Sequence, residues 1–210
     1  MSIRIGSYDF FAHTIDGGAY LLIFLYWAHR YYAVPVDFIN VSTAKAVIFI
    51  GLAFIIGIVF DAICSLSWFR LFRRQNLYEQ ALADVLKRNP KIQLQLEGFD
   101  WPIYFLYIKR LNIEMARDAE HYNVYCVMLR NVSFGLLIIA IQAIVEFVQR
   151  GYQWRYPIAA VICLLLSVNI ARQAVKFQSW FYESILQAFI ALIADPPKSA
   201  QKASIADRLS

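Results

Sequence analysis

Charged and amide side chains interrupt several long apolar stretches of this 210-residue sequence. These residues are Asp61, Arg130, Asn131, Gln142, Glu146, Asn169 and Arg172. Inside a membrane helix such groups are costly, so they pair with one another or line a path for ions or protons. The chemistry that they suggest is therefore ion pairing, hydrogen bonding and charge movement.

Five of these residues share one depth if their apolar stretches are helical. Counted from the cytoplasmic end of each helix at a rise of about 1.5 Å per residue, all five lie in the cytoplasmic half of the membrane. They are Asp61, Arg130, Asn131, Asn169 and Arg172. Asp61 then has Arg130 or Arg172 within reach. The simpler interpretation is that the five groups fix helix packing. The functional interpretation is a polar path or trigger, which is incomplete because nothing comparable crosses the outer half.

Glu146 lies near the opposite, outer end of its apolar stretch. Arg150 and Arg155 follow it, and either guanidinium is close enough along the chain to reach the carboxylate. The expected outer-side ion pair is Glu146 with Arg150, and Arg155 is the alternative partner.

No catalytic or metal-binding pattern accompanies these groups. Asp9, His13 and Asp16 lack a second set of ligands nearby, and Arg117 and His121 are one residue too close for the RxxxxH spacing of HEPN nucleases. The sequence has no nucleophile motif and no phosphate-binding glycine loop. Its three cysteines, without CxxC spacing, read as small apolar residues. We therefore expect no enzyme activity, no metal and no cofactor.

The elements that carry these residues are those of an integral membrane protein. The chain is 60% hydrophobic and 17% charged, whereas soluble domains are about 45–50% apolar and about 25% charged. The apolar residues form blocks long enough to span a bilayer. The net charge of +5 comes from basic residues beside these blocks, as in cytoplasmic loops. Direct nucleic-acid binding is not expected.

The first half of the chain predicts an interfacial segment followed by two spans. Residues 1–18 mix aromatic and polar side chains, which suits a helix at the membrane surface. Gly17-Gly18 allows a turn or close packing. Residues 19–69 form the first transmembrane hairpin, with spans at 19–36 and 44–69. The basic boundary that follows on the cytoplasmic side is Arg70, Arg73 and Arg74.

The central region, 70–123, is expected to be cytoplasmic and largely helical. Apolar residues recur at helical spacing over 76–89 and again from Ile108 to Tyr122, where the helix should run directly into the third span. Between them, Lys91–Glu97 alternates as a short strand does. The aromatic stretch 99–108 is expected to touch the membrane surface.

Residues 124–176 predict the second transmembrane hairpin, with spans near 124–148 and 157–174. The helical pattern continues over 177–194 as an amphipathic cytoplasmic extension. Asp195-Pro196-Pro197 ends it, and 195–210 reads as a disordered tail. The predicted fold class is thus all-α, with four transmembrane helices and an amphipathic helical extension.

The charge bias of the loops sets the expected orientation. Residues 70–122 hold nine Lys and Arg, residues 35–43 hold none, and the loop after the third span holds two. Because basic residues concentrate in cytoplasmic loops, both termini should be cytoplasmic. A bacterial inner membrane is the expected location, with an organelle membrane left open.

Short motifs resemble those of uncharacterised bacterial four-span proteins associated with antiphage defence. The motifs are Tyr8-Asp9-x-Phe11, Ile15-x-Gly17, Gly57-x-x-x-Asp61, the stem Arg117–Tyr122 and Arg130-Asn131. Such proteins usually have Pro-Gly where this chain has Asp16-Gly17. The resemblance implies a small homo-oligomeric inner-membrane component that senses, anchors or permeabilises together with a cytoplasmic protein partner.

Three classes of function follow for a protein of this kind. The leading hypothesis is a non-enzymatic membrane effector, sensor or anchor in contact with membrane lipids, whose cytoplasmic helices receive a signal or partner. The first alternative is an accessory structural subunit of a larger membrane complex. The second is a small transporter or lipid-binding protein, although the chain has no inverted repeat of the kind that secondary transporters use.

Overall fold

The computed structural model describes residues 7–33, 42–72, 76–88, 100–150 and 153–194. All regular structure in these ranges is helical: α1 (Ser7–Tyr32), α2 (Thr43–Phe72), α3 (Leu77–Arg88), α5 (Trp101–Leu111), α6 (Ile113–Gln149) and α7 (Arg155–Ala194). The expected strand at Lys91–Glu97, the tail at 195–210 and residues 1–6 lie outside the described ranges.

The chain divides into two compact units. Unit 1 comprises residues 1–73 and 124–174, and unit 2 comprises residues 74–123 and 175–210. Helices α6 and α7 contribute residues to both units. The boundary between the units falls after residue 123 in α6 and after residue 174 in α7.

Three of the described helices are long enough and apolar enough to cross a membrane: Thr43–Leu66 within α2, α6 and α7. Helix α7 has 40 residues, or about 60 Å at the usual rise. Helix α1, which contains most of the expected first span at 19–36, is not among the three. The N-terminal half of α1 carries His13, Thr14 and Asp16, which leaves a shorter apolar run than in α2, α6 or α7.

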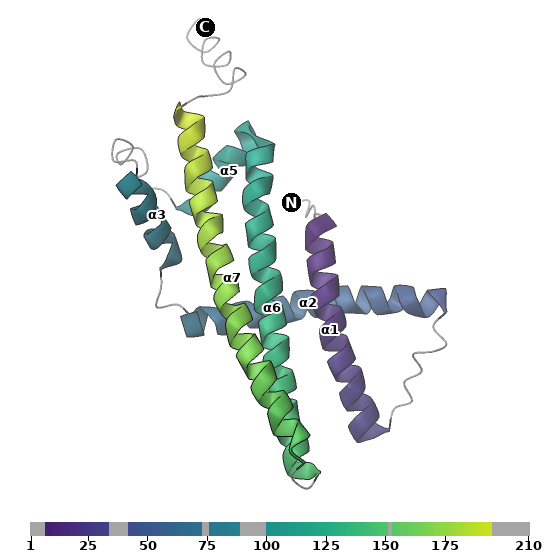
Figure 1. Ribbon diagram of the computed structural model, residues 1–210. Coiled ribbons are helices and arrows are strands. Elements are labelled where there is room, and N and C mark those ends of the chain that lie inside the picture. Colours follow the sequence, from purple (N-terminus) through teal and green to yellow (C-terminus); the bar gives the residue numbers. More distant parts are fainter. Residues whose placement is uncertain (1–6, 34–41, 73–75, 89–99, 151–152, 195–210) are drawn as a thin grey trace, which may run out of the picture. The chain divides into compact units, whose positions relative to one another are not determined.

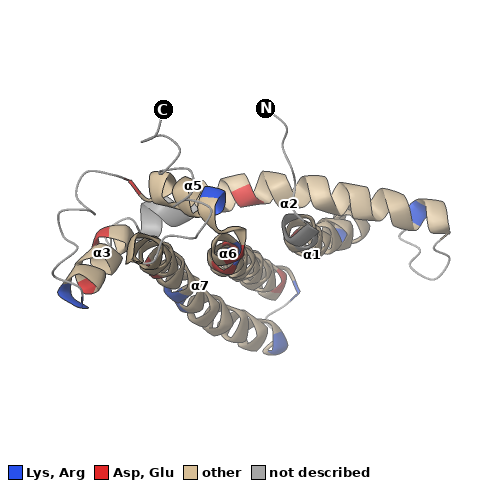
Figure 2. Ribbon diagram, turned by 90° about the horizontal axis from the view of Figure 1, so that it is seen from above, with Lys and Arg blue, Asp and Glu red and all other residues tan. Residues whose placement is uncertain are grey.

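Helix α1 runs without a break from Ser7 to Tyr32, so Gly17 and Gly18 do not form a turn. They serve the other role open to small residues, which is close packing. Helix α2 crosses α1 there (Figures 1 and 2), and a Cβ added to Gly17 would overlap the backbone of Ala53 and Gly57. A Cβ on Gly57 would overlap the His13 carbonyl. The close contact between α1 and α2 therefore lies at His13 and Gly17, before the start of the predicted hairpin at 19–69, and at Ala53 and Gly57 within it.

The interior of unit 1 is built from small residues. Its buried members include Ala12, Ala53, Cys64, Cys126, Ala140, Ala143, Ala160, Ala171 and Ala174. The large apolar residues point outward instead, as with Ile55 on α2 and Leu165 on α7. Small residues at helix contacts let backbones approach closely, which is how membrane helices pack without a hydrophobic driving force between them.

The interior of unit 2 is built mainly from large residues, with Ala81, Ala116 and Ala119 between them. Its core contains Val85, Tyr104, Ile108, Phe181, Ile185, Leu186 and Leu192. Trp101 packs edge-on against Phe181, with ring centroids 5.3 Å apart, and Tyr104 packs against Phe189 at 4.6 Å. At the edge of this core, burial raises the pKa of Tyr78 to about 12, and Tyr104 and Asp100 nearby act in the same direction.

Asn112 separates α5 from α6, where the sequence predicted one helix from Ile108 into the third span. Its backbone is extended (φ −146°, ψ 99°). Its side-chain oxygen accepts hydrogen bonds from the backbone N–H groups of Glu114 (3.1 Å) and Met115 (3.2 Å). This is the N-cap arrangement, which satisfies backbone donors that have no partner inside the helix. The continuous-helix prediction is therefore wrong at this residue.

Candidate functional site

The crossing of α1 and α2 brings polar side chains of both helices together inside unit 1. Asp16 and Tyr20 lie one turn apart on α1, and both are buried. The Tyr20 ring stacks on Phe60 of α2, with centroids 4.1 Å apart. Its hydroxyl lies 3.7 Å from the Cys64 sulfur, also on α2. The glycine crossing thus determines which groups of the two helices meet.

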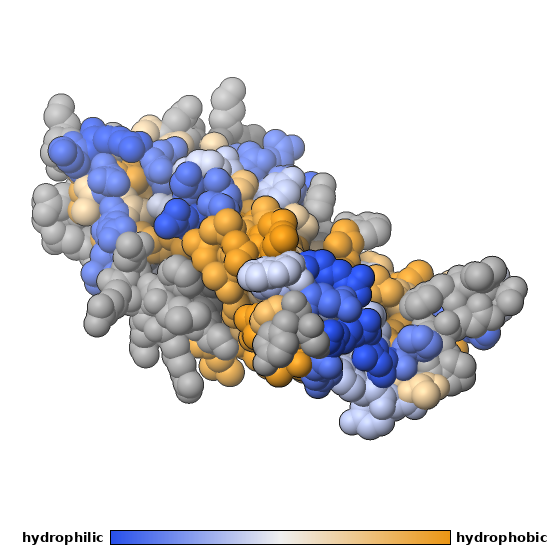
Figure 3. Space-filling model, turned by 60° about the horizontal axis from the view of Figure 1, so that its bottom comes forward, coloured by the Kyte–Doolittle hydropathy of each residue, from blue (hydrophilic) through white to orange (hydrophobic). Residues whose placement is uncertain are grey.

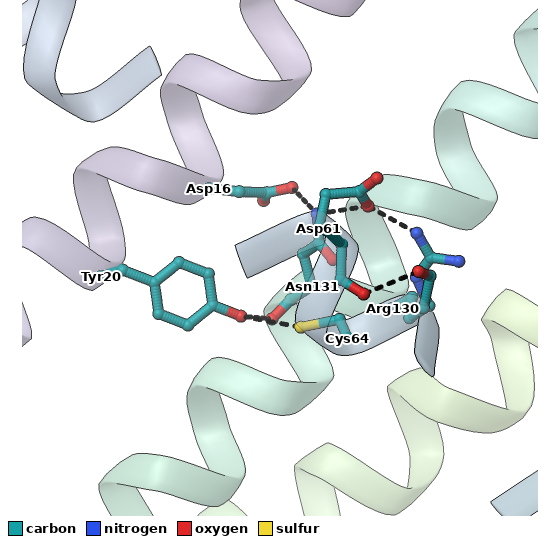
Figure 4. Close-up of polar contacts among 8 residues, drawn as sticks. Asp16, Tyr20, Asp61, Cys64, Arg130 and Asn131 are labelled. Carbon is teal, nitrogen blue, oxygen red and sulfur yellow. Dashed lines mark hydrogen bonds and ion pairs between the residues drawn. The ribbon is translucent and has the colours of Figure 1, made fainter. Parts of the chain in front are cut away.

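Asn131 of α6 is the centre of this polar cluster (Figure 4). Its Nδ2 donates hydrogen bonds to Asp16 Oδ2 at 3.1 Å and to Asp61 Oδ1 at 3.2 Å. Its backbone carbonyl accepts a 2.6 Å bond from the Tyr20 hydroxyl. Asn131 is completely buried, and Asp16 is only 2% exposed. One amide therefore connects α1, α2 and α6.

Arg130 completes the cluster on the side of Asp61. Its Nη2 donates to Asp61 Oδ1 at 2.5 Å, and both side chains are mostly buried. The cluster thus contains two carboxyl groups and one guanidinium. If both carboxyl groups are ionised, its net charge is −1, which is expensive in a poorly solvated environment.

The hydrogen bonding of the cluster is incomplete. Within the described residues, no partner is found for Asp16 Oδ1, Asn131 Oδ1 or Arg130 Nε. Buried polar groups are normally satisfied, and a partly satisfied network is less stable than a complete one. The arrangement is suited to holding helices in register and to gaining or losing a charge.

The structure brings together some of the residues proposed from the sequence and separates others. Asp61, Arg130 and Asn131 meet in the cluster, and Asp61 pairs with Arg130 rather than with Arg172. Arg172 is exposed on α7. Asn169 is also exposed, and its Nδ2 donates to the Leu165 carbonyl of its own helix at 3.0 Å.

Sequence reasoning missed the contributions of Asp16 and Tyr20. In the sequence, Asp16 stands out as a possible metal ligand with Asp9 and His13 and as a neighbour of Gly17, but not as a member of the intramembrane polar group. Among the residues that the structure describes, no group of three or more His, Cys, Asp or Glu side chains is arranged to hold a metal. The usable signal was the position of Asp16 beside Gly17 and one turn before Tyr20, because side chains one turn apart share a helix face.

A second ionic group lies at the other end of unit 1. Glu146 of α6 is 2% exposed, and its carboxylate lies 2.6 Å from Arg150 Nε and 3.6 Å from Arg30 Nε. The sequence predicted Arg150 as the partner. Arg30 was missed because it belongs to α1, far away along the chain.

The helices α6 and α7 are also joined by a pair of serines. Ser133 Oγ donates to the Ser167 carbonyl at 3.0 Å, and Ser167 Oγ donates to the Ser133 carbonyl at 2.8 Å. Both serines are buried. Reciprocal bonds of this kind fix the register of two closely packed helices.

The side chains of the basic boundary proposed after the second span lie outside what the structure describes. Arg73 and Arg74 lie outside the described residues, and of Arg70 only the backbone, within α2, is described. Comparison with known proteins adds no family: no family model, no curated protein and no solved structure matches this chain.

Proposed function

We propose that this protein is a non-enzymatic membrane effector, sensor or anchor, and that the polar cluster of unit 1 is its coupling element. The observation that carries the proposal is a buried charge network, Asp16–Asn131–Asp61–Arg130, which joins three helices. Ionisable groups inside membrane helices are rare and mark functional sites by default.

Membrane residence is supported by the three long apolar helices and by the outward-facing large side chains of unit 1. The proposed topology has four spans, with α1 as the additional one, and both termini in the cytoplasm of a bacterial cell. Helix α2 has few charged residues along its length (Figure 2). For α1 and α2 both to cross the bilayer, they must tilt about their contact at Gly17 and Gly57.

A coupling role explains the cluster better than packing alone. The glycine crossing and the alanine-rich interior already bring the helices close together. Two carboxyl groups and one guanidinium in this interior reduce its stability. The remaining negative charge must be neutralised by a proton or by a further cation. In this proposal, the two charge states of the cluster are the two states between which the switch changes.

The cytoplasmic partner in this proposal acts on unit 2. Helix α5 buries Tyr104 and Ile108 but leaves Ile103, Leu106 and Tyr107 exposed. An apolar surface on an otherwise well-packed unit is typical of an interaction site. Because α6 contains residues of both units, partner binding would be transmitted along this helix to Arg130 and Asn131.

The test is purification of the tagged full-length chain from its native host in mild detergent, with particle sizing and mass spectrometry of associated proteins. A homo-oligomer carrying one soluble partner supports the proposal. Co-purification in fixed stoichiometry with many membrane subunits would instead show that the protein is an accessory subunit of a larger membrane complex. Labelling of single engineered cysteines with a membrane-impermeant reagent checks the topology in the same cells.

The cluster is tested in reconstituted vesicles by comparing Asp61→Asn and Arg130→Gln with the exposed control Arg172→Gln. We expect both cluster variants to change partner-dependent ion leakage or partner affinity, while the control behaves as the unmodified protein. Unchanged behaviour of both cluster variants, with normal assembly, would reduce the cluster to a packing element.

A further inference from the structure

An apolar groove of about 360 Å³ lies within unit 1, between the C-terminal halves of α1 and α6 and the start of α7. Leu22, Ile23, Ile139 and Ala143 form its apolar wall. Glu146 and Tyr156 line it as well. The volume falls in the range of small-molecule sites, about 300–1,000 Å³, and most of the lining is hydrocarbon or aromatic.

Gln142 and Tyr26 also line the groove, and three guanidinium groups contact Glu146 and Tyr156. Arg30 and Arg150 flank the Glu146 carboxylate at 3.6 Å and 2.6 Å. Arg155 lies over the Tyr156 ring, 5.0 Å from its centroid, and donates to the Tyr156 hydroxyl at 3.2 Å. With one carboxylate for three cations, this end of the groove has a charge of +2.

These arginines remain accessible. Arg30 and Arg150 are 39% and 34% exposed, although they hold the nearly buried Glu146 between them. Their positions are close to the helix ends, because α1 ends at Tyr32, α6 ends at Gln149 and α7 begins at Arg155. Figure 3, which brings the lower end of Figure 1 forward, shows hydrophilic residues gathered beside apolar ones on this face.

The residues around these helix ends match the headgroup level of a bilayer. Tyr31, Tyr32 and Trp154 are exposed there, and Tyr and Trp concentrate at the boundary between hydrocarbon and water. In the proposed topology, the basic end of the groove meets lipid phosphates, and the apolar wall extends toward the hydrocarbon.

We propose that this groove binds an anionic phospholipid, with one acyl chain along Leu22, Ile23 and Ile139 and the phosphate at the guanidiniums. Arginine pairs with phosphate through several N–H donors at once. An ethanolamine headgroup fits less well, since its ammonium needs a carboxylate and Glu146 is already flanked by two arginines. The inference depends on the membrane residence proposed above but not on the coupling role of the polar cluster.

The experiment uses the purified full chain and native mass spectrometry in detergent with added phosphatidylglycerol or phosphatidylcholine of identical chains. We expect a one-to-one phosphatidylglycerol adduct retained about tenfold more strongly than phosphatidylcholine. Free glycerol phosphate at the same concentration should not displace it, because the headgroup alone lacks the groove contacts.

Two changes should remove the preference. The variant Glu146→Gln/Arg150→Gln/Arg155→Gln removes two cations together with the buried carboxylate, so that Glu146 is not left without Arg150. Ile139→Trp fills the groove from an exposed position and should reduce retention of both lipids. Lys45→Gln, a cation of unit 1 outside the groove, serves as the matched control and should retain the preference.

Equal retention of the two lipids by the unmodified protein would overturn the proposal. So would an undiminished preference in the triple variant, or displacement by free glycerol phosphate, which would identify a simple anion site. Loss of the preference in Lys45→Gln to the same extent as in the triple variant would show general charge attraction instead of this groove.

Discussion

The interiors of the two units differ in the size of their buried side chains. Unit 1 buries alanines, cysteines, Tyr20 and a charged cluster, and turns most of its large apolar residues outward. Unit 2 buries tyrosine, phenylalanine, leucine and isoleucine in a single core. The second pattern is the one that water imposes, since burying large apolar surface is the main favourable term in folding. The first pattern needs a surrounding that accepts exposed hydrocarbon.

The two units should therefore lose stability for different reasons. Unit 1 depends on close backbone approach and on matched polar groups, so it should be sensitive to added volume and unmatched charge. Unit 2 depends on filled space, so it should be sensitive to lost volume. The variants below test this difference in order of expected effect.

The largest effect is expected for Gly17→Ala. The new Cβ would overlap the backbone of Ala53 and Gly57, and backbone cannot move aside as a flexible side chain can. Because the overlap is with backbone, we expect a larger loss of stability than the about 1–3 kcal/mol typical of overpacking: the contact between α1 and α2 should be lost altogether, seen as early thermal aggregation in detergent. Gly51→Ala is the matched control, since no atom lies within 4 Å of a Cβ built there. Equal melting of the two variants would show that the crossing does not hold unit 1 together.

Next in size is Phe181→Ala in unit 2. Phe181 is buried in the core against Trp101, and its truncation leaves a cavity that costs about 3–5 kcal/mol. The comparison is Ile55→Ala in unit 1, which removes an exposed side chain of α2 and should cost little in detergent. The hydrogen-exchange rates of the backbone amides, measured segment by segment, report both changes in stability. If Ile55→Ala were the more damaging, the contrast between the two interiors would be lost.

A smaller effect is expected when Arg130 is neutralised. Arg130→Gln leaves Asp61 without its cation, at a cost of about 2–3 kcal/mol, while Arg130→Gln/Asp61→Asn should recover much of this loss. Arg172→Gln removes an exposed cation of α7 and should stay within about 0.5 kcal/mol of the unmodified protein. Denaturant titration in mixed micelles supplies the three values. Additive single and double effects would mean that the ion pair contributes nothing of its own.

The smallest effect concerns pH and is confined to unit 2. The pKa of Tyr78 is raised to about 12 in the folded chain, above its usual value near 10. The folded state therefore keeps a proton that the unfolded state loses, and this contribution is present below pH 10 and disappears as the pH rises to about 12. Tyr78→Phe should lose stability less steeply than the unmodified protein over that interval. Parallel curves for the two proteins would exclude a role for this phenol.

The helices were largely predictable because their signals are local. Apolar runs and helical spacing indicated α2, α3 and the long α6 and α7, although the break at Asn112 was missed because an N-cap inside an otherwise continuous pattern is a weak signal. The cluster was predictable only in part. Charged residues within apolar helices marked Asp61 and Arg130, but their spacing placed Arg172 at the same depth and did not say which side of α7 it occupies.

The sequence by itself determined which segments are long apolar helices and which are amphipathic helices. Hydropathy, charge and helical periodicity depend on neighbouring residues alone. Only the tertiary structure decided that α1 meets α2 at Gly17 and Gly57, that Asn131 bonds to both Asp16 and Asp61, and that Arg30 reaches Glu146. These contacts join positions far apart along the chain. Their pairing follows from how closely two backbones can approach, and that is a property of helices packed in space rather than of any one stretch of residues.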